Sequence, residues 1–334
     1  MKPTNQTHET QQDSAKINGA IGRFFQNFHL ATILNHSGIR KTKGTSALTI
    51  MSSIFALAFN GKDFFRAIVQ HQSVPFGKDA AYELLKGTCH NWRKVLMMIS
   101  VKLLAFFNSL TNQTREKVLI IDDSPYDRSR SKKVELLARV FDHAEKKFIR
   151  GFRLLSVCWS DGVSLLPLDF ALLSSKDKKN RFQGITKDVD KRSCGYKRRL
   201  EAMEKATDLV NSMVGRILSY RIKFNYILMD SWFCSPKVIC ALHQYAPVIG
   251  MVKKTSKVLY DFGGLELDVK SIYRRLPKRR GRAQILSHAL ISVGGIDAKL
   301  VFVRDRRKKD WLVLVSTNAQ LANEEIVRLY GRRW

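Results

Sequence analysis

Two short segments of the chain could carry chemistry, because each ends an apolar run with aspartate. Val118–Ile121 is followed by Asp122 and Asp123, and Tyr226–Met229 is followed by Asp230. Runs of four or five apolar, partly β-branched residues predict buried strands, so these carboxylates are expected at the carboxyl ends of two strands. Acids at the ends of neighbouring strands can share one divalent cation, since Mg²⁺ (or Mn²⁺) takes hard oxygen ligands. An acid in this place is also compatible with capping a helix or starting a turn.

The charge of the chain indicates what such a site would act on. The chain has 58 Lys and Arg residues against 29 Asp and Glu residues, a formal net charge of +29. This excess is far beyond what solubility needs, and it predicts a large polyanion as partner, nucleic acid before a membrane surface. A cation held by two carboxylates in so basic a chain would act on a phosphodiester. An unrelated basic RNA-binding protein would explain the charge but not the two strand-end aspartates.

The cysteines and the apolar stretches indicate the compartment. The five cysteines are scattered and form no CxxC pair, which argues against a disulfide framework or a structural zinc site and favours a reduced cytosol. The amino-terminal segment is polar and does not resemble a signal peptide. The apolar stretches Thr49–Phe59 and Leu96–Leu110 are too short to span a bilayer and are expected to be core helices. We therefore expect a cytoplasmic protein with no membrane role.

The pattern along the chain predicts three parts. Residues 1–16 are rich in Gln, Thr and Asn and are expected to be a disordered tail. Residues 17–114 have helical spacing and predict a small all-helical domain, either a DNA-binding domain or a plain bundle packed on the next domain. Residues 115–334 alternate strand-like runs with helices, which predicts an α/β fold. Within it, residues 247–317 are β-rich and are expected to be an insertion, and a last helix is expected to begin near Asn323.

Three segments of this chain resemble the bacterial DDE transposases of the insertion-sequence-4 family. They are IIDDS at 120–124, ILMDS at 227–231 and IVRLYGRRW at 326–334, and the resemblance covers roughly residues 115–334. It implies an RNase H-like catalytic core with a β-rich insertion between the second Asp and a final Glu. It also implies metal-dependent chemistry on double-stranded DNA.

The resemblance also implies which acids would hold the metal. The first Asp of the family motif precedes a Ser or Thr, which selects Asp123 as a catalytic metal ligand. Asp122 is the alternative, and adjacent residues of a strand point to opposite faces. The second Asp of the motif matches Asp230.

The third family motif reads Tyr, two residues, Arg, three residues, Glu. Tyr330 and Arg333 fit its first two positions, and the resemblance implies that they contact phosphates near the cleaved end. The Glu would fall beyond Trp334, so the core is expected to be incomplete at its carboxyl end and to lack the third acidic ligand. Glu324 and Glu325 lie more than three turns before that position, and we expect them in the first turn of the last helix, where they complement its dipole.

Several basic segments are candidates for contact with DNA. The residues that come after the first acids are expected to bind phosphate beside the metal; they are Arg128, Arg130, Lys132 and Lys133. The loops Lys176–Arg199 and Lys270–Arg282 could track a DNA backbone, or could be solvated surface. For Trp232, packing in the core is favoured over stacking on an unpaired base.

The function predicted from these features is that of a transposase. It would bind insertion-sequence ends as a homodimer on DNA, and would catalyse metal-dependent cleavage and strand transfer in the bacterial nucleoid. The alternative is a catalytically inactive, transposase-derived DNA-binding protein or an inhibitor of transposition. The sequence does not indicate the terminal repeat or the target preference.

Overall fold

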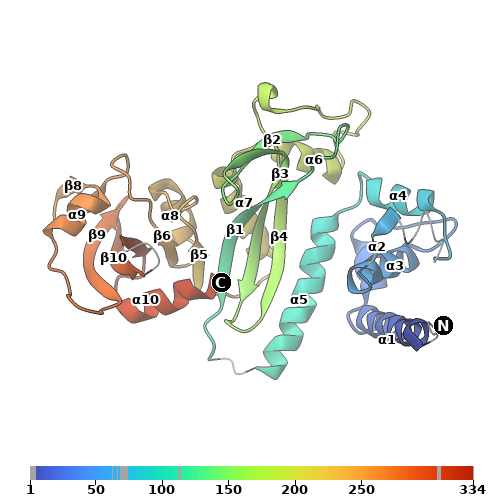
Figure 1. Ribbon diagram of the computed structural model, residues 1–334, viewed down its shortest axis with the longest axis horizontal. Helices are drawn as coiled ribbons and strands as arrows, with labels where there is room; N and C mark the ends of the chain where they lie inside the picture. Colours follow the sequence, from blue (N-terminus) through green and yellow to red (C-terminus); the bar gives the residue numbers. More distant parts are fainter. Residues whose placement is uncertain are drawn as a thin grey trace. The chain divides into compact units, whose positions relative to one another are not determined.

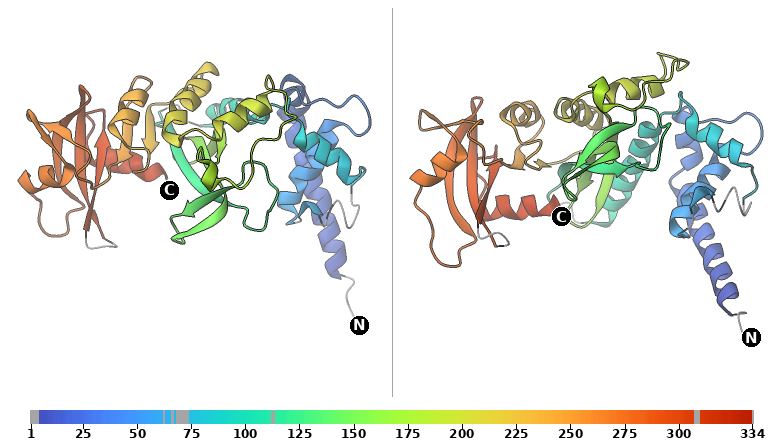
Figure 2. Two further views of the ribbon diagram at one scale, coloured as in Figure 1. Left: turned by 90° about the horizontal axis from the view of Figure 1, so that it is seen from above. Right: turned by 45° about the horizontal axis from the view of Figure 1, so that its top comes forward.

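The chain forms two compact units in a computed structural model (Figures 1 and 2). The described residues are 5–61, 63–65, 67, 74–111, 114–306 and 310–333, with the side chains of 5–15 left out. The first unit consists of Met1–Thr111 with Thr186–Leu200, and the second of Asn112–Ile185 with Glu201–Trp334. Within the described residues, every helix is too short or too polar to cross a membrane.

The first unit is built from helices. They are α1 (Asn5–Asn27), α2 (Leu30–His36), α3 (Ala47–Phe59), α4 (Lys78–Lys86) and α5 (Trp92–Leu110). Polar side chains cap the amino-terminal ends of two of these helices. The Ser46 hydroxyl accepts a hydrogen bond from the Thr49 amide at 3.1 Å, and the Asn91 side-chain oxygen Oδ1 accepts one from the Lys94 amide at 3.1 Å.

Helix α1 differs from the tail expected at residues 1–16. It begins at Asn5, and residues 1–4 lie outside the described residues. Ile21 and Phe25 in its second half are buried and anchor the helix. Once a helix is nucleated, each added residue gains a backbone hydrogen bond, so the polar residues before the anchor can extend it.

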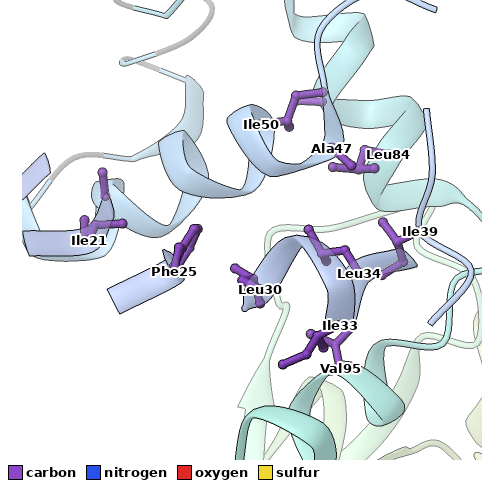
Figure 3. Close-up of a cluster of buried hydrophobic side chains, with 12 residues drawn as sticks. Ile21, Phe25, Leu30, Ile33, Leu34, Ile39, Ala47, Ile50, Leu84 and Val95 are labelled. Carbon is purple, nitrogen blue, oxygen red and sulfur yellow. The ribbon is translucent and has the colours of Figure 1, made fainter. Parts of the chain in front are cut away.

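The core of this unit joins its first four helices to the start of the fifth. Figure 3 shows side chains from separate helices converging on one cluster. Its labelled members are Ile21, Phe25, Leu30, Ile33, Leu34, Ile39, Ala47, Ile50, Leu84 and Val95.

A distant segment of sequence also belongs to this unit. Helix α6 (Cys194–Glu201) comes after the basic loop, and the Gly195 amide donates to the Thr88 carbonyl at 2.8 Å. A Cβ on Gly195 would lie 2.7 Å from the same oxygen, so the close approach requires glycine. Arg198 donates from Nη1 to the His90 carbonyl at 3.2 Å. The end of the loop expected at Lys176–Arg199 is therefore a helix packed on the turn before α5.

The second unit is a mixed α/β fold with one large, mostly antiparallel sheet. Its strands are β1 (Val118–Asp127), β2 (Ala138–Asp142), β3 (Lys147–Ser160), β4 (Leu165–Leu173), β5 (Tyr226–Met229), β6 (Val248–Met251), β7 (Tyr260–Phe262), β8 (Leu265–Leu267), β9 (Ile285–Val293), β10 (Ile296–Asp305) and β11 (Asp310–Ser316). The strand order is β2-β3-β1-β5-β6-β11-β10-β9-β7-β8, and β4 pairs with β3. β5 is parallel to β1 and to β6.

Helices and short 3-10 turns complete the second unit. They are η2 (Lys178–Asn180), α7 (Ala206–Ser219), α8 (Pro236–His243), α9 (Val269–Arg275), α10 (Asn323–Tyr330) and η3 (Gly331–Arg333). Helix α10 begins at the predicted residue, with Glu324 and Glu325 in its first turn as expected. It lies against β6, β9 and β11. Its side chains Ile326 and Leu329 are buried in a cluster with residues of the sheet.

Strand β1 is longer than its apolar run predicts. It does not end at Ile121 but continues to Asp127, because β3 pairs with it along the whole stretch, down to Asp127 opposite Gly151. Its parallel neighbour β5 ends at Met229. Asp122 and Asp123 therefore lie inside a strand, whereas Asp230 lies just beyond the end of one.

The β-rich segment expected as an insertion at residues 247–317 continues the same sheet. β11 pairs antiparallel with β6. On the other side of β11, β10 pairs with β11 and β9 pairs with β10. Beyond β9, the short strands β7 and β8 form the last part of the sheet. The sheet therefore runs without a break from the strands that carry the aspartates into this segment.

Candidate active site

Asp122 and Asp230 are brought together by the parallel pairing of β1 with β5. The last paired residues are Ile121 and Met229, and the two aspartates come directly after them. In parallel strands, residues in register share a face, so both carboxylates leave the sheet on the same side. Burial is the main reason why the pKa of Asp122 is raised, and the nearby charge of Asp230 raises it further.

A tight turn holds the Asp230 carboxylate. Its Oδ1 accepts the backbone amides of Trp232 at 2.9 Å and of Phe233 at 3.3 Å, and its carbonyl accepts the Cys234 amide at 3.1 Å. The Phe233 side chain is fully buried and fixes the turn. The neighbouring strand supplies Gly250, where a Cβ would lie 2.6 Å from the Cys234 sulfur.

Helix α10 and the turn η3 bring two further polar side chains to the acids. Arg333 donates from Nη2 to Asp122 Oδ1 at 3.1 Å and from Nη1 to the Tyr330 hydroxyl at 2.9 Å. The Arg333 side chain is only 3% exposed. Tyr330 is buried, which raises its pKa, and the Arg333 charge opposes that shift. All three segments that carry the family resemblance thus meet in space.

The pKa of Asp122 reflects these competing neighbours. Partial burial raises it above the ordinary value of 3.8, the Arg333 guanidinium lowers it, and Asp230 raises it again. The net shift is upward. Burial, the largest cause, together with the Asp230 charge therefore outweighs the stabilisation of the Asp122 carboxylate by Arg333.

Asp123, the acid selected from the sequence, lies elsewhere. Its Oδ2 accepts from Arg153 Nε at 2.5 Å, and its side chain is 5% exposed. Because side chains alternate along a strand, Asp123 leaves β1 on the face opposite Asp122. The pairing of β1 with β5 therefore places the alternative acid, Asp122, beside Asp230, and gives Asp123 a basic partner of its own.

Trp232 is not a core residue, which corrects the expectation from the sequence. It is 44% exposed. The Arg153 guanidinium lies 5.3 Å and the Lys253 ammonium 4.4 Å from the centre of its ring. Trp232, which lies within the turn that holds Asp230, thus forms part of a basic, aromatic surface beside Asp123.

An open pocket of about 890 Å³ adjoins Asp122. Its basic lining residues are Arg115, Arg328, Arg332 and Arg333. Some of this charge is balanced, because Arg115 pairs with Asp161 at 3.3 Å and Arg328 pairs with Glu325. The Glu325 pKa is lowered by its hydrogen bond from Arg328. Space, positive charge and two carboxylates therefore coincide on one face of the sheet.

The two carboxylates fit part of a divalent-cation site. Each offers hard oxygen atoms, and a cation between them would relieve the repulsion that raises the Asp122 pKa. The described residues contain no group of three His, Cys, Asp or Glu side chains that could hold a metal ion. Asp122 and Asp230 would therefore be two of the ligands of such a cation, and the described residues offer no third carboxylate, His or Cys that completes a site with them.

The basic residues predicted beside the acids lie further along β1. Arg128, Arg130, Lys132 and Lys133 are all exposed. The Arg128 guanidinium lies 4.9 Å from the centre of the Tyr126 ring. The Lys132 carbonyl accepts a hydrogen bond from Gln183 at 3.4 Å. They form an exposed basic loop, and none of them reaches Asp122 or Asp230 through a contact in the described structure.

Comparison with known proteins identifies the class to which this geometry belongs. The family model described as "DDE superfamily endonuclease" matches residues 67–289, about two thirds of the chain, and the match includes Asp122, Asp123 and Asp230. The chain belongs to this family. No curated protein matches it.

Among solved structures, the chain is similar to the Drosophila P element transposase strand transfer complex. The identity is 12% and the TM-score 0.27, with 78% of this chain and 55% of that chain covered. The chain thus spans about half the length of that transposase. At this score the likeness adds nothing to the description of the fold.

Proposed function

We propose that the protein is a transposase-type DNA endonuclease whose metal ligands include Asp122 and Asp230. The observation that carries this proposal is the pair of in-register aspartates in a member of the DDE superfamily endonucleases, which are generally dependent on divalent metals. The net charge of +29 supports a polyanionic substrate. When bound, Mg²⁺ (or Mn²⁺) would activate the attacking oxygen and stabilise the departing one.

The other residues of the site would position the DNA. Arg333 is held by Asp122 and Tyr330, and its positive charge would help to orient a phosphate beside the two acids. Tyr330 supports Arg333 from a buried position. We assign Asp123 a structural role, supported by its ion pair with Arg153.

We further propose an RNase H-like core. The strand order β4-β3-β1-β5-β6 supports it. In this order β1, β5 and β6 are parallel, β3 is antiparallel to β1, and β4 is antiparallel to β3. In this proposal the helical unit contributes DNA contacts. The basic residues of the segment Thr186–Leu200 support this, because the segment belongs to that unit and adds positive charge to it. A bacterial insertion-sequence-4 transposase, acting as a homodimer on element ends in the nucleoid, is the specific form we propose.

A catalytically inactive DNA-binding protein is the second candidate. It is favoured by the Arg333–Asp122 hydrogen bond, which occupies one oxygen of a metal ligand. Both candidates bind DNA with a steep dependence on salt, so binding alone does not separate them.

Cleavage assays separate the two candidates. The chain is incubated with a supercoiled plasmid that carries its gene and flanking DNA, in Mg²⁺, Mn²⁺ or EDTA. We expect metal-dependent nicking that Asp122→Asn and Asp230→Asn abolish and Asp123→Asn retains. Nicking that survives Asp230→Asn would refute the metal assignment. Binding without nicking in either metal would favour the inactive protein.

A further inference from the structure

Three arginines form a row across three strands of the second unit. Arg139 of β2 is the register partner of Arg150 of β3. Arg128 comes directly after the last residue of β1, and its amide donates to the Arg150 carbonyl at 2.8 Å. Because β3 lies between β2 and β1, the three residues are neighbours at the inter-strand spacing of about 4.8 Å. We call Arg128, Arg139 and Arg150 the arginine row.

Each guanidinium of the arginine row lies over an exposed aromatic ring. The distances from Cζ to the ring centre are 4.0 Å for Arg139 over Phe148, 4.9 Å for Arg150 over Phe182 and 4.9 Å for Arg128 over Tyr126. The rings are 57%, 46% and 41% exposed in that order. A ring holds a guanidinium by its face and leaves the N–H groups at its edge able to donate outward.

The row is not neutralised by the protein. In the part of the chain that the structure describes, no carboxylate forms an ion pair with any of the three arginines. Nearby acids are engaged elsewhere, since Glu145 pairs with Lys147 and Asp127 Oδ1 accepts the Ser129 amide at 2.7 Å. Like charges directly opposite one another destabilise a sheet. A polyanion that lies across the row would remove this repulsion.

The position of the row relates it to the candidate active site. Asp122 lies in β1, and Arg128 comes directly after the strand, six residues further along. Because six is an even number and side chains alternate along extended backbone, both side chains are on the same face. Six residues of strand rise about 20 Å. In duplex DNA this distance corresponds to about six base pairs.

We propose that the arginine row binds backbone phosphates of the same DNA duplex, about six base pairs from the phosphodiester that lies at Asp122. This inference rests on the proposed function, because it takes the cleaved DNA to lie at Asp122 and Asp230. The rings position the guanidinium groups for contact with phosphate, and in this proposal the rings do not stack on bases. The contact gives affinity and register but no sequence preference.

The salt dependence of DNA binding tests the row directly. The variant Arg128→Gln/Arg139→Gln/Arg150→Gln is compared with the full chain on a 30-base-pair duplex, in EDTA, over a range of KCl concentrations. Each lost phosphate contact reduces the slope of log Kobs against log salt by about 0.9, so we expect a slope shallower by about 2.7. An unchanged slope in the folded variant would overturn the proposal.

Two further variants control for charge and folding. Arg221→Gln/Lys223→Gln/Lys237→Gln removes three charges from exposed side chains that lie over no ring among the described residues, and should leave the slope unchanged. Arg128→Lys/Arg139→Lys/Arg150→Lys keeps the charge and should retain most of the slope. If both the control and the row variant changed the slope equally, the effect would be one of net charge, and the proposal would fail.

The length of the DNA separates this proposal from the proposed function. Duplexes whose arm is shorter than about six base pairs from the cleavage site should bind the full chain and the row variant equally, and longer arms should not. Asp122→Asn should abolish cleavage and keep the slope. If no protein cleaves DNA but the row variant alone has a shallower slope, the proposed function fails; the row then keeps its phosphate contacts, but the predicted distance to a cleavage site is overturned. A row variant that loses binding to poly(dT) but not to duplex would assign the row to single strands and overturn it.

Discussion

Asp122 and Asp230 occupy equivalent places on two parallel strands, one residue beyond the last register pair of β1 and β5. This relationship selects Asp122 over its neighbour Asp123, because only one of two adjacent strand residues can face Asp230. The Asp122 pKa is raised in part by the Asp230 charge, so the two acids also interact electrostatically. The register of these two aspartates is the main geometric support for a cation site among the described residues.

The first prediction concerns which acids bind metal. Asp122→Asn and Asp230→Asn should each weaken Mn²⁺ binding, measured by isothermal titration calorimetry, by more than about 100-fold, since losing even an outer partner of a metal ligand costs 10- to 100-fold. Asp123→Asn should bind Mn²⁺ as the full chain does, because Asp123 is paired with Arg153. Loss of binding in Asp123→Asn alone would restore the assignment made from the sequence.

The second prediction concerns stability against pH. The pKa of Asp122 in the folded protein lies above its ordinary value of 3.8, so the folded state binds this proton more tightly than the unfolded chain does. The contribution of Asp122 to the free energy of unfolding should therefore fall as pH rises from about 3.8 through its folded-state pKa, and stay level above it. Asp122→Asn removes this loss. In EDTA, urea denaturation should show the variant more stable than the full chain at pH 7 and equally stable at pH 3.

Saturating Mg²⁺ should reverse that order at neutral pH. A ligand that binds only the folded state stabilises it, and this gain requires the Asp122 carboxylate. Equal stabilisation of the variant and the full chain by Mg²⁺ would contradict a shared site at Asp122 and Asp230.

The sequence predicted much of this architecture, but the resemblance selected Asp123, whereas the pairing of β1 with β5 places Asp122 beside Asp230. Apolar runs located β1 and β5, and the Tyr330–Arg333 spacing placed both residues on the last helical turns. The choice of Asp122 depends on how far β1 runs and on its register with β5. Both are set by pairing with β3 and β5, strands more than 20 residues away in sequence. The local strand propensity of residues does not specify which strands pair or in which register.

The arginine row shows the same limit. Arg128, Arg139 and Arg150 are spaced at equal intervals in the sequence, yet nothing in their local pattern distinguishes them from other basic residues. Only the registers of β2 and β1 against β3 make them neighbours. The docking of residues 186–200 was missed for a related reason, because it depends on backbone hydrogen bonds to Thr88 and His90 and not on an apolar pattern.

The third prediction concerns Arg333. Its charge lowers the pKa of Asp122, so Arg333→Gln should raise that pKa further and move the acidic limb of the pH–rate profile of DNA nicking to higher pH. Lys237→Gln, an exposed residue paired with Asp208, is the control and should leave the profile in place. A fall in rate without any shift of the limb would limit Arg333 to binding phosphate.

The fourth prediction concerns the ion pair on the opposite face of β1. Asp123→Ala leaves Arg153 without its partner at a part-buried position, and should lower the free energy of unfolding by about 2 kcal/mol, less than the 3–5 kcal/mol of a fully buried pair. Asp123→Leu/Arg153→Met removes both charges and should recover most of this loss. Urea midpoints measure both effects. A double variant no more stable than Asp123→Ala would mean that the loss comes from packing.

The fifth prediction concerns the close packing behind Asp230. A Cβ on Gly250 would lie 2.6 Å from the Cys234 sulfur and 3.2 Å from Met229 Cγ, so Gly250→Ala should cost about 1–3 kcal/mol of stability by overpacking. The strain falls on the turn whose amides hold Asp230, so Mn²⁺ affinity should fall as well. Gly215→Ala is the matched control, because this glycine lies inside α7 with no atom within 4 Å of its Cβ position, and should gain about 0.5–1 kcal/mol. A Gly250→Ala protein that is destabilised but binds Mn²⁺ normally would show that the turn tolerates the strain and that Asp230 is held by other contacts.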